Sequence, residues 1–135
     1  MGSWDEKLRT GYIDIDQQHE NICQMVDALN VAMSKEDVQR YIEALELHFA
    51  THFDEEQALM ELHDYPLAGE HAQLHARFLH HVFLPLVRDL ERCQFDKERL
   101  AAFVVTMQTF VHEHVLGEDM KIVAYINNLR STEPA

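Results

Sequence analysis

The chain contains few of the residues that end or bend helices. Its 135 residues include only four glycines and three prolines, whose backbone properties disfavour helix interiors. The two cysteines, Cys23 and Cys93, form neither a C-x-x-C motif nor a disulfide framework, which favours a reducing compartment. The most apolar stretch, AAFVVTMQTFV, is interrupted by threonine and glutamine, so the sequence predicts neither a secretion signal nor a membrane-spanning helix. We therefore expect a cytoplasmic, largely helical protein.

Basic side chains are also scarce. Eleven Lys and Arg residues stand against 24 Asp and Glu residues, which gives a net charge of −13 at pH 7. Nucleic acids and anionic membrane surfaces bind clustered basic side chains, so both are excluded as expected partners. The chain is long enough for one hydrophobic core, and we expect a single domain over residues 1–135.

Four segments place apolar residues at the helical period of 3.6. Ser34, followed three residues later by Asp37, resembles a capping box at the start of the second helix. Pro66 can begin the third, Pro85 should kink or end it, and Gly117 is a plausible stop for the fourth. The predicted fold is all-α: an antiparallel up-down-up-down four-helix bundle over residues 16–116.

Two further segments flank the predicted bundle. An N-terminal arm over residues 1–15 carries four apolar side chains that we expect to anchor it on the bundle: Trp4, Tyr12, Ile13 and Ile15. A short amphipathic helix is predicted over residues 117–130. The polar residues that follow could begin a linker to a further domain.

Histidine is abundant, with ten residues, and several of them interrupt the apolar stripes. Any one of them could be a core histidine that donates to a backbone carbonyl. An unsatisfied buried polar group costs about 1–3 kcal/mol, so polar residues on every stripe need partners. Convergence from all four helices favours a metal site in the bundle interior. The candidate ligands on the stripes are His19, His52, Glu56, His71, His75 and His114.

The spacings support a common centre. His52 and Glu56 are four residues apart, as are His71 and His75, which places each pair on one helix face about 6 Å apart. His114 shares the stripe of its helix, whereas His112 does not. Asp119 lies five residues beyond His114, about 140° away on a regular helix. It can therefore face the same site only if the helix breaks, which a left-handed Gly117 would allow.

These motifs together resemble those of the hemerythrin family, in particular the bacterial hemerythrins. The resemblance rests on Trp4, Gly11, DQQH ending in His19, His52 to Glu56, His71 to His75, and His114 to Asp119. It implies a non-haem diiron site with an oxo or hydroxo bridge and an open position for dioxygen, or for NO or small anions. The implied ligands are His71, His75 and His114 on one iron, His19 and His52 on the other, and Glu56 and Asp119 as bridges.

The resemblance also implies an apolar pocket beside the open position. Where the family commonly has Trp, Leu and Ile, this chain has Phe110, Val111 and Val115. All three are smaller than their counterparts. We hypothesise a roomier pocket and faster oxidation of the iron pair.

The resemblance predicts a binding protein rather than an enzyme. The expected function is reversible dioxygen binding, as a carrier or store, or as the oxygen- or redox-sensing domain of a larger signalling protein. A diiron redox enzyme acting on O2, peroxide or NO, and an iron-handling protein, remain alternatives. Five histidines with two carboxylates favour reversible binding, because oxygen-activating diiron enzymes have ligand sets richer in carboxylates.

Overall fold

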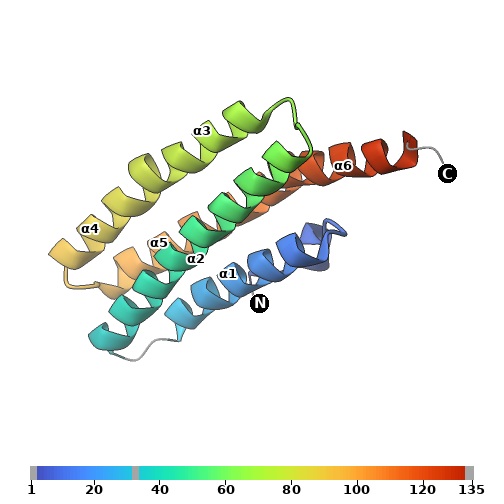
Figure 1. Ribbon diagram of the computed structural model, residues 1–135. Coiled ribbons are helices and arrows are strands. Elements are labelled where there is room, and N and C mark those ends of the chain that lie inside the picture. The colour runs from blue at the N-terminus through green and yellow to red at the C-terminus, as the bar shows by residue number, and fades with distance from the viewer. Residues whose placement is uncertain (1–2, 32–33, 133–135) are drawn as a thin grey trace.

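The computed structural model describes residues 3–31 and 34–132, and within them the chain forms a bundle of long helices (Figure 1). The arm and tail residues outside these ranges, and the link between the first two helices, lie beyond what is described. The elements are the 3-10 turn η1 (Glu6–Leu8), α1 (Ile13–Asn30), α2 (Lys35–Leu62), α3 (Ala68–Phe78), the π-helical η2 (Leu79–Phe83), α4 (Leu84–Arg92), α5 (Lys97–His114), the π-helical η3 (Val115–Asp119) and α6 (Met120–Thr132).

The elements combine into four helical rods, because η2 joins α3 to α4 and η3 joins α5 to α6. The first rod, α1, packs on α2 and α5. The α2 rod also packs on α3, and α4 packs on α5. Successive rods run in opposite directions, and α6 extends beyond the end of the bundle (Figure 1). The all-α helical bundle expected from the sequence is confirmed.

Local sequence signals explain where the helices begin. Ser34 Oγ accepts a hydrogen bond from the backbone N–H of Asp37 at 3.1 Å, which confirms the predicted cap of α2. Asp96 caps α5 in the same way through the N–H of Arg99 at 3.2 Å.

Two predicted helix breaks take a different form. The helix continues past Pro85, which has no N–H to donate to the carbonyl four residues earlier, and the wider π turn of η2 directly precedes it. Gly117 lies inside η3 and does not adopt a left-handed conformation; among the described glycines, a positive φ occurs at Gly11. The prediction that Gly117 stops the helix was therefore wrong. A π-helical turn carries α5 directly into α6, which starts at Met120.

The N-terminal arm is anchored by some of the residues expected and by one that was not. Leu8 is fully buried, whereas Ile13 is 82% exposed, so the prediction for Ile13 was wrong. Helix α1 begins at Ile13, earlier than residue 16, and its first turn directs that side chain to solvent. Ile15 is buried and Trp4 packs against the core, as expected.

Polar contacts with the side chains of Asp16 and Asp27 complete the attachment of the arm. The carboxylate of Asp16 accepts hydrogen bonds from the N–H and hydroxyl of Thr10 and from the N–H of Gly11, at 2.7 to 3.0 Å. Gly11 has a φ of +92°, which favours glycine in this tight turn. Further along the arm, Asp27 accepts from the backbone N–H of Ser3. These contacts hold the arm against α1.

The core is apolar at the end of the bundle where α1 meets α2 and α4 meets α5. Phe83 and Phe103 pack there with ring centroids 6.0 Å apart, and both are fully buried or nearly so. Phe49 continues the aromatic contacts toward the opposite half. Within the described ranges, no helix is long and apolar enough to cross a membrane.

Candidate metal centre

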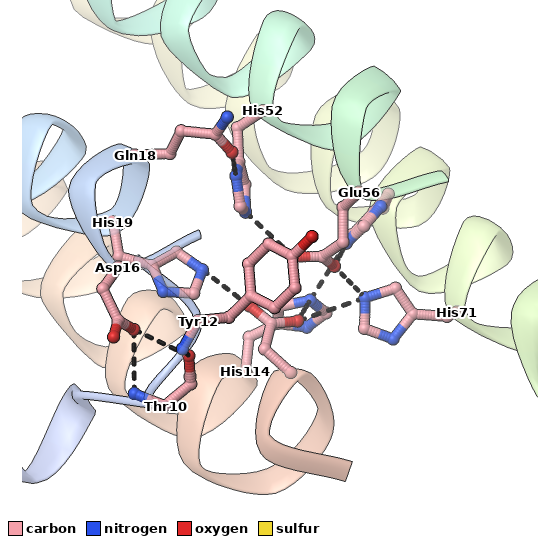
Figure 2. Close-up of polar contacts among 11 residues, drawn as sticks. Thr10, Tyr12, Asp16, Gln18, His19, His52, Glu56, His71 and His114 are labelled. Atoms are coloured by element: carbon pink, nitrogen blue, oxygen red, sulfur yellow. Dashed lines mark hydrogen bonds and ion pairs between the residues drawn. The ribbon is translucent and has the colours of Figure 1, made fainter. Parts of the chain in front are cut away.

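All seven predicted ligands meet in the half of the bundle near the α2 to α3 turn. Each rod contributes: α1 supplies His19, α2 supplies His52 and Glu56, α3 supplies His71 and His75, and the fourth rod supplies His114 and Asp119. All seven are buried, with at most 8% of any residue exposed. Figure 2 shows imidazoles and carboxylates converging from helices on opposite sides.

The π turn explains how Asp119 reaches the centre. His114 ends α5 and Asp119 ends η3. The N–H of Met120 donates to the carbonyl of Val115, five residues earlier, which is the hydrogen bond of a π turn. This wider turn brings residues five apart toward one face of the helix. Asp119 therefore faces the site without the left-handed break that the sequence suggested.

The donors form two groups that share both carboxylates. Glu56, His71, His75, His114 and Asp119 form the three-histidine group, and His19, His52, Glu56 and Asp119 form the two-histidine group. Within each group the potential ligand atoms lie within 4.8 Å of one another. The first group thus offers one more donor than the second.

Each carboxylate directs one oxygen to each group. Glu56 Oε1 contacts the Nε2 atoms of His71 and His75, and its Oε2 lies 3.2 Å from His52 Nε2. Asp119 shows the same division. Its Oδ1 lies 3.1 Å from His71 Nε2 and 3.0 Å from His114 Nε2, and its Oδ2 lies 2.8 Å from His19 Nε2. This is the arrangement expected of carboxylates that bridge two cations.

The electrostatics of the centre favour ionised carboxylates. Burial and the nearby Asp119 each oppose ionisation of Glu56, but its close contacts with the imidazoles of His52, His71 and His75 outweigh them and hold its pKa well below the ordinary value. The pKa of Asp119 is likewise lowered, because its close contacts with the imidazoles of His114, His19 and His71 outweigh its complete burial.

The two histidines of α3 respond differently to these carboxylates. Burial lowers the pKa of His71, but its hydrogen bonds to Asp119 and Glu56 prevail and raise that pKa to about 9. For His75 burial prevails and the pKa is lowered. Without a cation, the negative charge of the carboxylates is therefore balanced partly by a proton on His71.

Several atoms of the centre lack a well-directed hydrogen bond. Among the described residues these buried atoms include His19 Nε2, Glu56 Oε2 and both carboxylate oxygens of Asp119. The Nε2 atoms of His75 and His114 also face each other at 3.0 Å. Unsatisfied oxygens and facing imidazole nitrogens are costly in a dry interior. The imidazole and carboxylate donors, and their number, fit iron or a similar divalent metal.

A small cavity adjoins the two-histidine group. Its volume is about 10 Å³, close to the roughly 10–15 Å³ needed by one water molecule. The predicted pocket residues Phe110, Val111 and Val115 all line it, together with His19 and His52 of the two-histidine group, His114 of the three-histidine group and further side chains. The cavity therefore borders both imidazoles of the group with the smaller number of donors, and one of the three imidazoles of the other group.

Gln18 is a polar contact of the centre that the sequence reasoning missed. Its Oε1 lies 2.6 Å from Nδ1 of His52, between α1 and α2 (Figure 2). Gln18 lies about 100° from His19 on α1. That position on the side facing α2 was the available signal, but it depends on knowing which helix is adjacent.

The remaining histidines and Cys23 lie outside the two groups. His80 and His81 are exposed, and His112 donates from Nε2 to the backbone carbonyl of Ser3 at 2.8 Å. Glu55, next to the ligand candidate Glu56, is exposed to solvent. Burial raises the pKa of the Cys23 thiol to about 12, so this residue packs as a neutral side chain.

The fold and the centre together define a helical bundle whose interior carries side chains able to hold metal ions. The chain belongs to the hemerythrin family: the sequence model described as "Hemerythrin HHE cation binding domain" matches residues 10–126. This confirms the predicted resemblance, and it agrees with a binding protein rather than an enzyme.

Curated relatives carry the name Bacteriohemerythrin. The one from Stenotrophomonas maltophilia is 34% identical over 132 residues, which cover 95% of this chain and 81% of the relative. For Pseudomonas aeruginosa the identity is 32% over 82 residues, covering 58% of this chain and 54% of the relative. For Campylobacter jejuni it is 23% over 128 residues, covering 91% of this chain and 94% of the relative.

Proposed function

We propose that the chain binds dioxygen reversibly at a pair of iron ions held by the seven converging side chains. The observation that carries this proposal is the division of Glu56 and Asp119, each with one oxygen toward either donor group. His71, His75 and His114 would hold one iron, and His19 and His52 the other. The iron pair would supply the two electrons that bound dioxygen takes up and returns.

The protein side chains determine where the ligand binds. The two-histidine group offers four donors, one fewer than the three-histidine group, and the cavity of about 10 Å³ lies beside it. Phe110, Val111 and Val115 line that cavity with apolar surface, which limits the entry of water and of anions that need hydration. A small uncharged diatomic molecule therefore suits this position best.

The donor set favours binding over turnover. Five imidazoles are neutral ligands, and two carboxylates contribute two negative charges to two divalent cations. Such a centre stabilises high-valent iron less than a carboxylate-rich centre does. We infer that dioxygen is bound and released rather than used to oxidise a substrate.

The same binding step serves a carrier, a store or a sensing domain. A sensing role would require the centre to influence another part of the molecule. The direct continuation of Asp119 into α6, which extends beyond the bundle, provides a covalent route (Figure 1).

Optical spectroscopy tests the proposal. Protein loaded with Fe(II) without oxygen should contain about two irons per chain and be nearly colourless. Air should produce a charge-transfer band that disappears when oxygen is removed and returns over repeated cycles. A band that never reverses, or an iron content of one or less, would contradict reversible binding at an iron pair.

A further inference from the structure

Gln18 distinguishes His52 from the other histidines of the centre. Its Oε1 approaches His52 Nδ1 at 2.6 Å. A carbonyl oxygen can only accept, so in this contact Nδ1 carries the proton and donates. The proton of a neutral imidazole resides on one nitrogen alone, and His52 Nε2 is then left with a free lone pair. That atom faces Glu56 Oε2 at 3.2 Å, inside the two-histidine group.

We propose that Gln18 is a positioning residue for the second metal position: its Oε1 selects the Nδ1-protonated form of His52 and aims an unprotonated Nε2 at the centre. This inference rests on the proposed function, since it assigns Gln18 a role toward a metal held there. The opposite tautomer would place an N–H against Glu56 and leave no lone pair for a metal.

The two-histidine group has four donors and the three-histidine group has five, so the position of each donor matters more in the first. His19, the other imidazole of the group, has a buried Nδ1 without a hydrogen-bond partner among the described residues. Its tautomer is therefore not selected by such a contact. With four donors in the group, a misplaced His52 removes a quarter of them. Loss of such an outer hydrogen bond typically weakens metal binding by about 10–100-fold.

Cobalt titration of three variants tests the inference. Gln18→Leu removes the acceptor, and Gln18→Glu keeps an acceptor of the same reach. Gln17→Leu is the matched control, because the neighbouring Gln17 is exposed and donates along its own helix to Asn21 at 3.0 Å. Co(II) is added without oxygen, and the two binding equivalents are followed by visible absorption.

We expect Gln18→Leu to weaken the second equivalent of Co(II) by about 10–100-fold and to leave the first within about threefold. Gln18→Glu and Gln17→Leu should bind both equivalents within about threefold of the wild type. If Gln18→Leu binds both as the wild type does, or if Gln18→Glu fails to retain the second, the inference is wrong. A wild-type chain that binds fewer than two equivalents would instead contradict the proposed function.

A second measurement separates tautomer selection from a general structural effect. Long-range proton–nitrogen NMR spectra of the Zn(II)-loaded chain report which ring nitrogen of His52 carries the proton. Wild type and Gln18→Glu should show a protonated Nδ1 in slow exchange with water, and Gln18→Leu should lose that slow signal. A protonated Nε2 in the metal-free wild type would overturn the assignment directly.

Discussion

The two halves of the bundle are stabilised by different physics. At the apolar end, Phe83 and Phe103 pack against aliphatic neighbours, and their burial stabilises the fold regardless of pH or bound ions. At the other end, five imidazoles and two carboxylates occupy equivalent interior positions. Their burial is favourable only while charges and lone pairs are satisfied. The apolar half therefore stabilises the fold under all conditions, and the stability of the other half can depend on the ions that it binds.

The largest expected effect follows from the shared carboxylates. Because Glu56 belongs to both donor groups, Glu56→Ala should reduce the metal content from about two ions per chain to below one. Glu55→Ala is the matched control, since this neighbour is exposed. Metal analysis after dialysis measures both. Retention of one full equivalent in Glu56→Ala would argue against a bridging role.

Truncation at the apolar end should act on stability alone. Phe103 is 2% exposed. Phe103→Ala removes its ring, and such changes lower the free energy of unfolding by about 3–5 kcal/mol. The cost should be equal in metal-loaded and metal-free protein, because Phe103 packs with Phe83 in the apolar core and belongs to neither donor group. Chemical denaturation of both forms measures it. A cost confined to the loaded form would show that the two halves are not independent.

The pH dependence of metal-free protein should come from the centre. The lowered pKa values of Glu56 and Asp119 contribute stability above the ordinary carboxyl values of 4.5 and 3.8, and this stability is lost as pH falls below that range. His71 has the opposite sign. Its pKa, raised from 6.5 to about 9, contributes stability that is complete below pH 6.5 and lost as pH rises through 9.

Metal binding should remove the alkaline part of this dependence. A ligating His71 has no proton on the metal-facing nitrogen. The loaded protein therefore loses no stability in the pH range where the metal-free protein loses the His71 proton. Denaturation midpoints between pH 6 and pH 10, with and without metal, compare the two forms. An equal alkaline loss in both would contradict the assignment of His71 as a ligand.

The smallest expected effect concerns the cavity. Val115→Ile should fill part of its volume of about 10 Å³ and slow irreversible oxidation of the loaded centre. We expect the oxidation rate to fall about threefold. This corresponds to less than the roughly 1.4 kcal/mol of activation free energy that a tenfold change in rate represents. Val104→Ile, at a buried position outside the cavity lining, is the control. The decay of the oxygenated spectrum measures both, and no slowing in Val115→Ile would contradict the idea of a roomy pocket.

Helical periodicity located the helices and indicated which histidines face inward, because residues three and four apart share a helix face. His52 with Glu56, and His71 with His75, could be grouped on this basis. Asp119 could not, because its position depends on a π turn that no local signal announced. The arm was also misjudged at Ile13, since apolar character alone does not say which side of a first helical turn meets the bundle.

The sequence by itself determined the all-α class, the inward stripes and six of the seven candidate ligands, because these depend on spacing along single helices. Asp119 was assigned as a ligand only through the family resemblance. Only the tertiary structure decided that Glu56 and Asp119 each divide their oxygens between two groups, that the cavity adjoins the two-histidine group, and that Gln18 reaches His52. These features join side chains on different helices. Their distances depend on how the rods pack, and packing is not encoded in the period of any one segment.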